Sequence, residues 1–263
     1  MSDLGTVMLR SGALVAASMA LLWLLSLRLR DASIVDPFWG AGYVLLAWLG
    51  WMSSEGAGPR RALALALVTA WGVRLSLHLL LRNAGKGEDP RYQAMRAGHG
   101  ERFWLVSLFT VFGLQGALMW VISLPLQAAL AADEPARLGI LDGAGAALWA
   151  AGFLFEAVGD WQLARFRRDP ASRGRVLDTG LWRYTRHPNY FGDALQWWGL
   201  GCLGLAAGAP WTLVSPVLMT VLLLRVSGVS LLEKDIAERR PAYRDYVRRT
   251  SAFFPWFPAK VHQ

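Results

Sequence analysis

The chain has 263 residues, of which 54% are hydrophobic and only 17% are charged, and its mean hydropathy is +0.31. Soluble domains carry about 25% charged residues, so this composition excludes an ordinary soluble protein and an intrinsically disordered one. Cys202 is the single cysteine, which excludes an intrachain disulfide and a cysteine-rich zinc site, and no metal site is expected. The composition predicts an all-α, polytopic integral membrane protein.

Apolar runs of roughly membrane-spanning length predict seven transmembrane helices, of which the second and the sixth are short. No internal repeat or low-complexity linker interrupts them, so we expect residues 1–263 to form a single membrane domain. In chain order the predicted spans are 6–27, 38–52, 62–81, 103–130, 138–158, 190–205 and 211–232.

The distribution of basic residues predicts the orientation. With the N-terminus outside, 21 of the 27 basic residues fall in inner loops, four in outer loops and two within spans. Cytoplasmic loops are enriched in Lys and Arg, so we expect an outer N-terminus and a cytoplasmic C-terminus. Membrane topology then explains the excess of basic residues, so we expect a lipid membrane and not a nucleic acid as the partner. The richness in Arg and Ala indicates a bacterial source, and hence the inner (cytoplasmic) membrane.

The first apolar run is expected to remain as a helix. Arg28 and Arg30 follow this run, whereas a signal peptide carries its basic residues before the apolar run and a cleavage site after it.

The inner region 160–193 carries seven arginines. Arginine binds phosphate through two parallel hydrogen bonds, so this region is typical of a site for an anionic nucleotide cofactor. The positive-inside rule alone is the alternative explanation for the number of arginines. Pro188 at a helix start indicates free N–H groups that face a ligand. The candidate cofactor-binding residues here are Arg165, Arg167, Arg168, Arg175, Arg186, His187, Asn189 and Tyr190.

A second polar stretch precedes the fourth predicted span. Gly85 and Gly87 allow a tight loop, in which Lys86 and Arg91 would add two cations to the phosphate site. A solvated, charge-balanced loop is the alternative.

Further ionisable residues lie at or within the predicted spans. Asp36 comes directly before Pro37, where it either serves the chemistry or caps the second span. Arg74 and His78 lie one turn apart inside the third span. Because ionisable groups in a bilayer are costly, we expect them to face the bundle interior, a cavity or each other.

The tail contributes two tyrosines and a closing aromatic segment. Tyr243 and Tyr246 fall on one side of a helix and are expected either to cover the cofactor or to pack against the bundle. The closing segment 253–258, of sequence FFPWFP, is typical of an interfacial anchor.

Together these motifs resemble the steroid 5α-reductase superfamily, and more closely its bacterial membrane branch, long described as a domain of unknown function. The resemblance rests on residues 155–162, 181–193, 243–246 and 254–255, and on residues 36–40 and 87–92 in the N-terminal half. It implies a seven-helix membrane enzyme that uses NADPH to reduce a carbon–carbon double bond conjugated to a ketone, as in 3-oxo-4-ene steroids.

The resemblance also implies where the cofactor binds. Residues 139–258 would form the cofactor-binding half of the domain. The family's cofactor-binding pattern falls on Asp160, Arg167, Arg175, Tyr184, Asn189 and Asp193.

Membrane methyltransferases of the isoprenylcysteine and phospholipid types are the competing class. They also carry Arg-His-Pro-x-Tyr, as residues 186–190 do here, and they bind S-adenosylmethionine there. The seven predicted spans, Asp36 and the loop 88–92 favour the reductase, and Glu233 is followed by Lys234 where methyltransferases carry paired glutamates. A transporter or lipid-binding protein is disfavoured because the ionisable residues collect in the inner loops.

The implied reaction transfers a hydride to the β-carbon of an enone while an acid polarises the carbonyl oxygen. We expect Tyr92 to be this acid, with Asp36 or His78 as its helper. The apolar substrate would enter a monomeric enzyme from the bilayer. The aromatic side chains expected to line its path are Phe38, Trp39 and Trp197.

Overall fold

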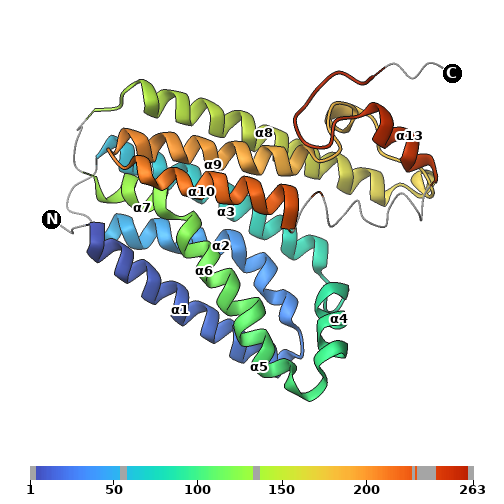
Figure 1. Cartoon of the computed structure of the whole chain (residues 1–263), viewed down its shortest axis with the longest axis horizontal. Helices are drawn as coiled ribbons and strands as arrows, with labels where there is room; N and C mark the ends of the chain where they lie inside the picture. The colour runs from blue at the N-terminus through green and yellow to red at the C-terminus, as the bar shows by residue number, and fades with distance from the viewer. Residues whose placement is uncertain (1–3, 54–57, 133–136, 227–228, 230–240, 260–263) are drawn as a thin grey trace. The chain divides into compact units, whose positions relative to one another are not determined.

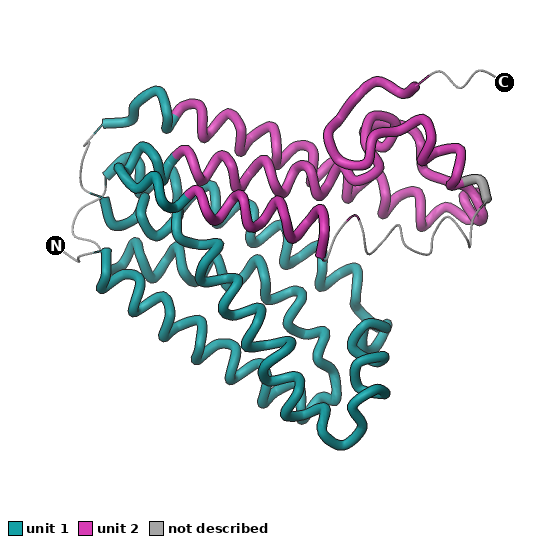
Figure 2. Tube along the Cα trace, in the orientation of Figure 1, with its two compact units in different colours: residues 1–142, 203–212 teal, residues 143–202, 213–263 magenta. Residues whose placement is uncertain are grey.

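The computed structural model describes residues 4–53, 58–132, 137–226, 229 and 241–259, and all regular elements in this part of the chain are helices (Figure 1). The all-α prediction is confirmed for these residues. The chain divides into two compact units (Figure 2). Unit 1 comprises residues 1–142 and 203–212, and unit 2 comprises residues 143–202 and 213–263.

Unit 1 combines long apolar helices with short connecting ones. In chain order they are α1 (Leu4–Leu29), the 3-10 helix η1 (Ala32–Ile34), α2 (Val35–Met52), α3 (Pro59–Asn83), α4 (Pro90–His99), the 3-10 helix η2 (Gly100–Arg102), α5 (Phe103–Ser107), the π-helical segment η3 (Leu108–Gly113), α6 (Leu114–Ile122) and α7 (Leu124–Ala131). The 3-10 helix η6 (Pro210–Leu213) follows later in the chain.

Helices α2 and α3 pack closely because each presents a glycine to the other. A Cβ atom at Gly40 would lie 2.4 Å from the carbonyl oxygen of Gly72, and one at Gly72 would lie 2.5 Å from that of Gly40. Beside this contact the buried ring of Tyr43 packs on Trp71, with 5.5 Å between the ring centroids. Small residues at a helix contact stabilise membrane bundles through van der Waals packing. The contact fixes α2, and with it Asp36 in the first turn of that helix.

The prediction of one continuous helix over residues 103–130 is wrong. Helix α6 ends at Ile122 and α7 begins at Leu124, with Ser123 between them. Pro125 has no amide hydrogen, so the i to i−4 hydrogen-bond ladder of α6 cannot continue through it. Gln127 Nε2 donates to Ser123 Oγ at 2.6 Å, which adds a side-chain bond at the junction.

Two arginines of a predicted outer loop, Arg60 and Arg61, are buried in the first turn of α3. Arg60 makes a bidentate ion pair with the buried Asp142, with Nε–Oδ1 at 2.7 Å and Nη2–Oδ2 at 3.0 Å. The Gly139 amide donates to the same carboxylate at 2.8 Å. Bidentate pairing compensates both buried charges and holds the start of α3 at residue 142.

Unit 2 contains two long helices, followed by shorter ones and a folded tail. Its elements are α8 (Ile140–Arg168), whose first residues belong to unit 1, the 3-10 helices η4 (Pro170–Ser172) and η5 (Gly180–Arg183), α9 (Pro188–Ala206), whose last residues belong to unit 1, α10 (Val214–Val221), the π-helical segment η7 (Leu222–Val226) and α13 (Pro241–Arg249).

Helices α8 and α9 run antiparallel along a seam of facing glycines. A Cβ at Gly152 would lie 2.5 Å from the carbonyl oxygen of Gly192, and one at Gly145 would lie 2.6 Å from that of Gly199. The glycines recur every seven residues, which keeps them on one face of each helix. This glycine seam brings the polar residues of the two helices into direct contact.

Within the described residues, five helical segments are long and apolar enough to cross a membrane, which indicates an integral membrane protein. They are Leu4–Leu29, Ala32–Met52, Pro59–Asn83, Pro90–Ile122 and Ile140–Arg168. The apolar segment Pro210–Val226 is shorter, and the predictions of seven spans and an outer N-terminus stay predictions. Helix α8 continues past residue 158 to Arg168, so Asp160 lies within a helix and not at its end.

Candidate functional site

Five of the predicted site residues lie in two groups of polar side chains, one in each unit. The Asp36 group, in unit 1, consists of the predicted Asp36, Arg91 and Tyr92 and of Gln115, which was not predicted. The Asp160 group, in unit 2, consists of two hydrogen-bonded pairs, the predicted Asp160 with Asn189, and Glu156 with Gln196, which were not predicted.

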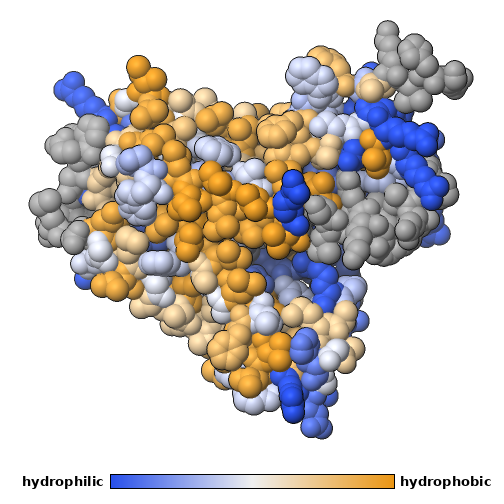
Figure 3. All heavy atoms as spheres, viewed as in Figure 1, coloured by the Kyte–Doolittle hydropathy of each residue, from blue (hydrophilic) through white to orange (hydrophobic). Residues whose placement is uncertain are grey.

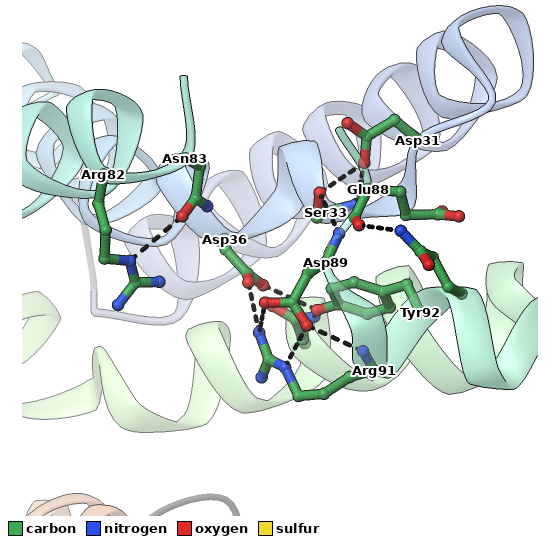
Figure 4. A network of polar contacts seen from close by, with 11 residues as sticks. Asp31, Ser33, Asp36, Arg82, Asn83, Glu88, Asp89, Arg91 and Tyr92 are labelled. Carbon is green, nitrogen blue, oxygen red and sulfur yellow. Dashed lines mark hydrogen bonds and ion pairs between the residues drawn. The ribbon is translucent and has the colours of Figure 1, made fainter. Parts of the chain in front are cut away.

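Asp36 and Tyr92 form the centre of the first group (Figure 4). The Tyr92 hydroxyl donates to Asp36 Oδ1 at 2.7 Å, and Gln115 Nε2 donates to the Tyr92 hydroxyl oxygen at 3.3 Å. Tyr92 is buried, whereas Asp36 and Gln115 are half-buried. The phenol therefore donates its single hydroxyl hydrogen to Asp36 and accepts a hydrogen bond from Gln115. These two bonds fix its orientation.

Arg91 neutralises the carboxylate of Asp36 from the more exposed side. Its Nη2 lies 2.7 Å from Asp36 Oδ2, and its Nε lies 2.9 Å from Asp89 Oδ1. The side chain of Arg91 is 51% exposed, against 14% for Asp36. Arg91 was predicted to bind a phosphate, and in the structure its guanidinium bridges two carboxylates next to Tyr92.

The loop before α4 is shaped by its glycines and by a helix cap. Gly85 and Gly87 have φ values of 73° and 71°, in the left-handed region that favours glycine. Asp89 accepts a hydrogen bond from the Arg91 amide at 2.9 Å, and Pro90 opens α4. This start places Arg91 and Tyr92 in the first turn of α4.

A second set of contacts, not predicted as site residues, holds this loop against η1. Glu88 accepts the amide hydrogen of Ala32 at 2.8 Å and both Nε and Nη2 of Arg96, at 3.0 and 2.7 Å. Ser33 Oγ accepts from the Asp89 amide at 3.3 Å. We call Ala32, Ser33, Glu88 and Arg96 the Glu88 clasp. Because Asp36 and Tyr92 each follow within one turn, the clasp sets their separation.

The clasp also affects the ionisation of the two loop carboxylates. Burial acts to raise the pKa of Glu88, but the Arg96 and Ala32 hydrogen bonds outweigh it and hold the pKa below its usual range. Burial also acts to raise the pKa of Asp89, but the hydrogen bonds and the charge of Arg91 outweigh this effect. The pKa of Asp89 is therefore lowered as well. Both carboxylates are therefore ionised at neutral pH.

The second group lies along the glycine seam. Asn189 Nδ2 donates to Asp160 Oδ1 at 3.1 Å, and Gln196 Nε2 donates to Glu156 Oε2 at 2.6 Å. Asp160, Glu156 and Gln196 are buried. The amide oxygens of Asn189 and Gln196 have no hydrogen-bond partner within the described ranges. Buried polar atoms ordinarily have partners, so these two oxygens are candidate acceptors for a ligand.

Arg186, a predicted cofactor residue, holds the tail of the chain. It is buried, and its Nη1 donates to the carbonyl oxygens of Val247, at 3.1 Å, and Thr250. A cation at the C-terminus of α13 is also favoured by the helix dipole. The hydroxyl of Tyr246 donates to the carbonyl oxygen of Trp182, so the tail is fixed both to η5 and, through Arg186, to the turn before α9.

The remaining predicted residues occupy a range of environments. His187 is buried and stacks on Tyr190, with 5.5 Å between ring centroids, and Tyr243 is buried on α13. Asp193 is half-buried on α9, and His78 is half-buried on α3. The exposed members are Lys86, which lies in unit 1, and Arg165, Arg167, Arg168, Arg175 and Tyr184 in unit 2. Among the described residues, no three His, Cys, Asp or Glu side chains gather as a metal ion would require.

Comparison with known proteins identifies the family. A family model described as "Protein of unknown function (DUF1295)" matches residues 22–250, and because this covers most of the chain, the protein belongs to that family. "Uncharacterized protein C594.04c" of Schizosaccharomyces pombe (strain 972 / ATCC 24843) is 25% identical over 261 residues, which cover 89% of this chain and 75% of the relative. No solved structure matches the chain.

Proposed function

We propose that this member of the DUF1295 family is a membrane reductase that uses NADPH to reduce a carbon–carbon double bond conjugated to a ketone. The hydrogen bond between Tyr92 and Asp36 carries the proposal. The resemblance of the sequence motifs to steroid 5α-reductases supports it. The proposed substrate is an apolar enone of the 3-oxo-4-ene steroid type, which reaches the enzyme from the bilayer.

Reduction of an enone requires a hydrogen-bond donor at the carbonyl oxygen, because negative charge builds there as the β-carbon accepts hydride. A phenol with its ordinary pKa near 10 remains protonated at neutral pH and can donate. We assign this role to Tyr92, which turns its hydrogen from Asp36 to the substrate oxygen, and the enolate that forms then takes a proton from water at its α-carbon. Arg91, at 2.7 Å, balances the charge of Asp36 during this step, and Gln115 holds the phenol oxygen.

The cofactor is assigned to unit 2, whose residues fit its chemistry. The free amide oxygen of Asn189 can accept from a carboxamide or a ribose hydroxyl, while Asp160 orients the same amide. Bound NADPH would supply the hydride. The side chains assigned to its pyrophosphate and 2′-phosphate are the exposed Arg165, Arg167, Arg168 and Arg175.

The apolar part of the substrate is assigned to aromatic residues near Asp36 on α2. Trp39 contacts Tyr43 edge to face at 5.4 Å, and Tyr43 contacts Trp71 in turn. Tyr43 and Trp71 are buried and only support this region from behind, whereas the half-buried rings of Phe38 and Trp39 offer a rigid apolar surface to a fused-ring or isoprenoid substrate. With the cofactor residues in an inner region, the site would face the cytoplasm of a bacterial cell.

A binding titration tests the cofactor without any knowledge of the substrate. Purified protein in lipid nanodiscs is titrated with NADPH, NADH and S-adenosylmethionine, and binding is followed by calorimetry. We expect NADPH to bind most tightly, because each charge-assisted contact to the 2′-phosphate contributes about 1.5 to 3 kcal/mol. Arg168→Gln should weaken NADPH but not NADH, whereas Arg137→Gln, in the predicted outer loop, should change neither.

Two results would reject the proposal. Equal affinity for NADPH and NADH would show that the protein makes no favourable contact with the 2′-phosphate. Tighter binding of S-adenosylmethionine than of either nucleotide would favour the methyltransferase class. Oxidation of NADPH in the presence of a panel of enones then tests the reaction. Tight NADPH binding without turnover of any enone would support the assigned cofactor and reject the assigned substrate class.

A further inference from the structure

The tail of unit 2 exposes a group of aromatic side chains. Phe254, Trp256 and Phe257 are 66%, 72% and 77% exposed. Tyr184 is also exposed and contacts Phe257 edge to face, with 6.0 Å between ring centroids. We call these four residues the aromatic rim. Contiguous exposed apolar side chains of this kind mark an interaction surface.

The adjacent helix α13 does not provide this surface. Its apolar side is already used, because Tyr243 and Tyr246 are buried. Its opposite side is polar, with Arg244, Asp245 and Arg248 exposed. An amphipathic helix that lies on a membrane turns its apolar face to the lipid, so α13 itself is not placed to do so. The segment that follows α13 is the part that presents apolar side chains to the surroundings.

The backbone of the rim is fixed before any partner binds. The Trp256 amide donates to the carbonyl oxygen of Tyr184 at 2.9 Å, and the Ala259 amide donates to that of Arg249 at 2.8 Å. Upstream, the Arg186 amide donates to the carbonyl oxygen of Ser251 at 2.9 Å. A surface ordered in advance binds without the entropic cost of ordering it.

Basic side chains flank the rim. Arg183 is exposed directly before Tyr184, and the side chain of Arg248 is 71% exposed at the end of α13. Figure 3 shows hydrophilic residues around α13 next to the largely apolar surface over α9 and α10. Trp and Tyr concentrate at the interface between lipid and water, and Arg is attracted to anionic headgroups. The combination matches an anionic lipid leaflet.

We propose that the aromatic rim inserts into the headgroup region of an anionic lipid leaflet, with Arg183 and Arg248 in contact with lipid phosphates. The partner is the lipid surface itself, and not a soluble protein. This inference does not depend on the proposed reductase activity, because it rests on exposure, backbone hydrogen bonds and charge in the tail alone.

A fluorescent label on the rim tests the proposal in the full-length protein. In a Cys202→Ala background, Trp256→Cys is labelled with nitrobenzoxadiazole and reconstituted into vesicles of phosphatidylcholine with or without phosphatidylglycerol. Ala171→Cys, at an exposed position on η4 of the same unit, is the matched control. We expect the label at 256 to emit at shorter wavelength than the control and to be quenched by lipids that carry a spin label near the headgroup.

Each other outcome overturns part or all of the proposal. Equal, unquenched emission from positions 256 and 171 would show that the rim lies in water. Emission at short wavelength without quenching by labelled lipid would show that protein covers the rim, either this chain or a second copy. Arg183→Gln combined with Arg248→Gln should abolish the added effect of phosphatidylglycerol, and its persistence would reject the role of the arginines.

Discussion

The Asp36 group and the Asp160 group solve the problem of charge in a membrane protein differently. In the first, Asp36 is paired with both a phenol and a guanidinium, and in the adjacent clasp Glu88 is paired with Arg96. In the second, the carboxylates of α8 are bound by neutral amides of α9, whose oxygens point to no partner within the described part of the chain.

This difference indicates a division of labour. A network in which each hydrogen and each charge has a partner is rigid, which suits a group that must orient one proton. A pair of helices that leaves buried acceptors available has capacity to bind a ligand. We therefore expect substitutions in the Asp36 group to affect turnover, and substitutions in the Asp160 group to affect cofactor affinity.

The largest expected effect is that of Tyr92→Phe. Loss of the general acid should slow turnover of the best enone by roughly 100- to 10,000-fold, with NADPH affinity nearly unchanged. NADPH oxidation in liposomes measures the first quantity and calorimetry the second. Trp104→Phe is the control, because Trp104 is an exposed aromatic residue on α5 of the same unit and lies outside the Asp36 group and the proposed substrate surface. Near-normal turnover of Tyr92→Phe would exclude Tyr92 as the acid and make His78 the candidate.

An intermediate effect is expected for Asn189→Ala and Asp160→Ala. Each should weaken NADPH binding by about 1 to 2 kcal/mol, or about 5- to 30-fold, while turnover at saturating cofactor is retained. Trp198→Phe is the control on α9, where it removes only an exposed hydrogen bond to Thr220. Wild-type affinity in both variants would reject the assignment of these residues. Loss of a folded, monodisperse protein in both would give the pair a purely structural role.

The smallest expected effect concerns stability and its pH dependence. Glu88→Gln should lower the free energy of unfolding by about 1 kcal/mol at pH 7, because it weakens the bonds to Arg96 and Ala32. The pKa of Glu88 is lowered in the folded protein, so its stabilising contribution is complete above the ordinary pKa of about 4.3 and is lost as the pH falls through the lowered value.

Thermal unfolding in detergent measures this effect between pH 7 and pH 3. The wild type should exceed Glu88→Gln in stability at pH 7, and the two curves should converge at the acidic end. Glu101→Gln, at an exposed position on η2, should follow the wild type throughout. A constant difference between wild type and Glu88→Gln at every pH would contradict the role of the Glu88 carboxylate.

Hydropathy located the long helices because a bilayer demands continuous apolar segments, but it gave their ends poorly. The extension of α8 beyond residue 158 is polar, so it carries no hydropathy signal, although Arg165 and Arg168 continue the helix. The end of α6 was missed even though Pro125 in the sequence marks it, because the apolar run continues through the break. Apolar composition decides membrane insertion, whereas backbone hydrogen bonding decides helix boundaries.

The candidate site was predictable to the extent that local motifs describe it. The expectation that Asp36 and Tyr92 lie close together matches the 2.7 Å contact in the structure, whereas their chemical roles stay predictions. Glu88 and Gln115 were not selected as site residues, because each acts on a residue from a distant part of the chain and a single sequence contains no signal for such contacts. Arg186 was selected because arginine is always charged, which the sequence alone shows. Its main-chain hydrogen-bond acceptors could not be predicted, because they depend on the fold.

The dependence of Arg186 on α13 also bears on the order in which the protein is made. The guanidinium is synthesised long before its acceptors, since Thr250 follows it by 64 residues. Until α13 has been translated, Arg186 lacks these two carbonyl acceptors, and burying a cation without its full set of hydrogen bonds is costly. The final packing of the turn before α9 must therefore wait for α13, even though α8 can enter the bilayer during translation.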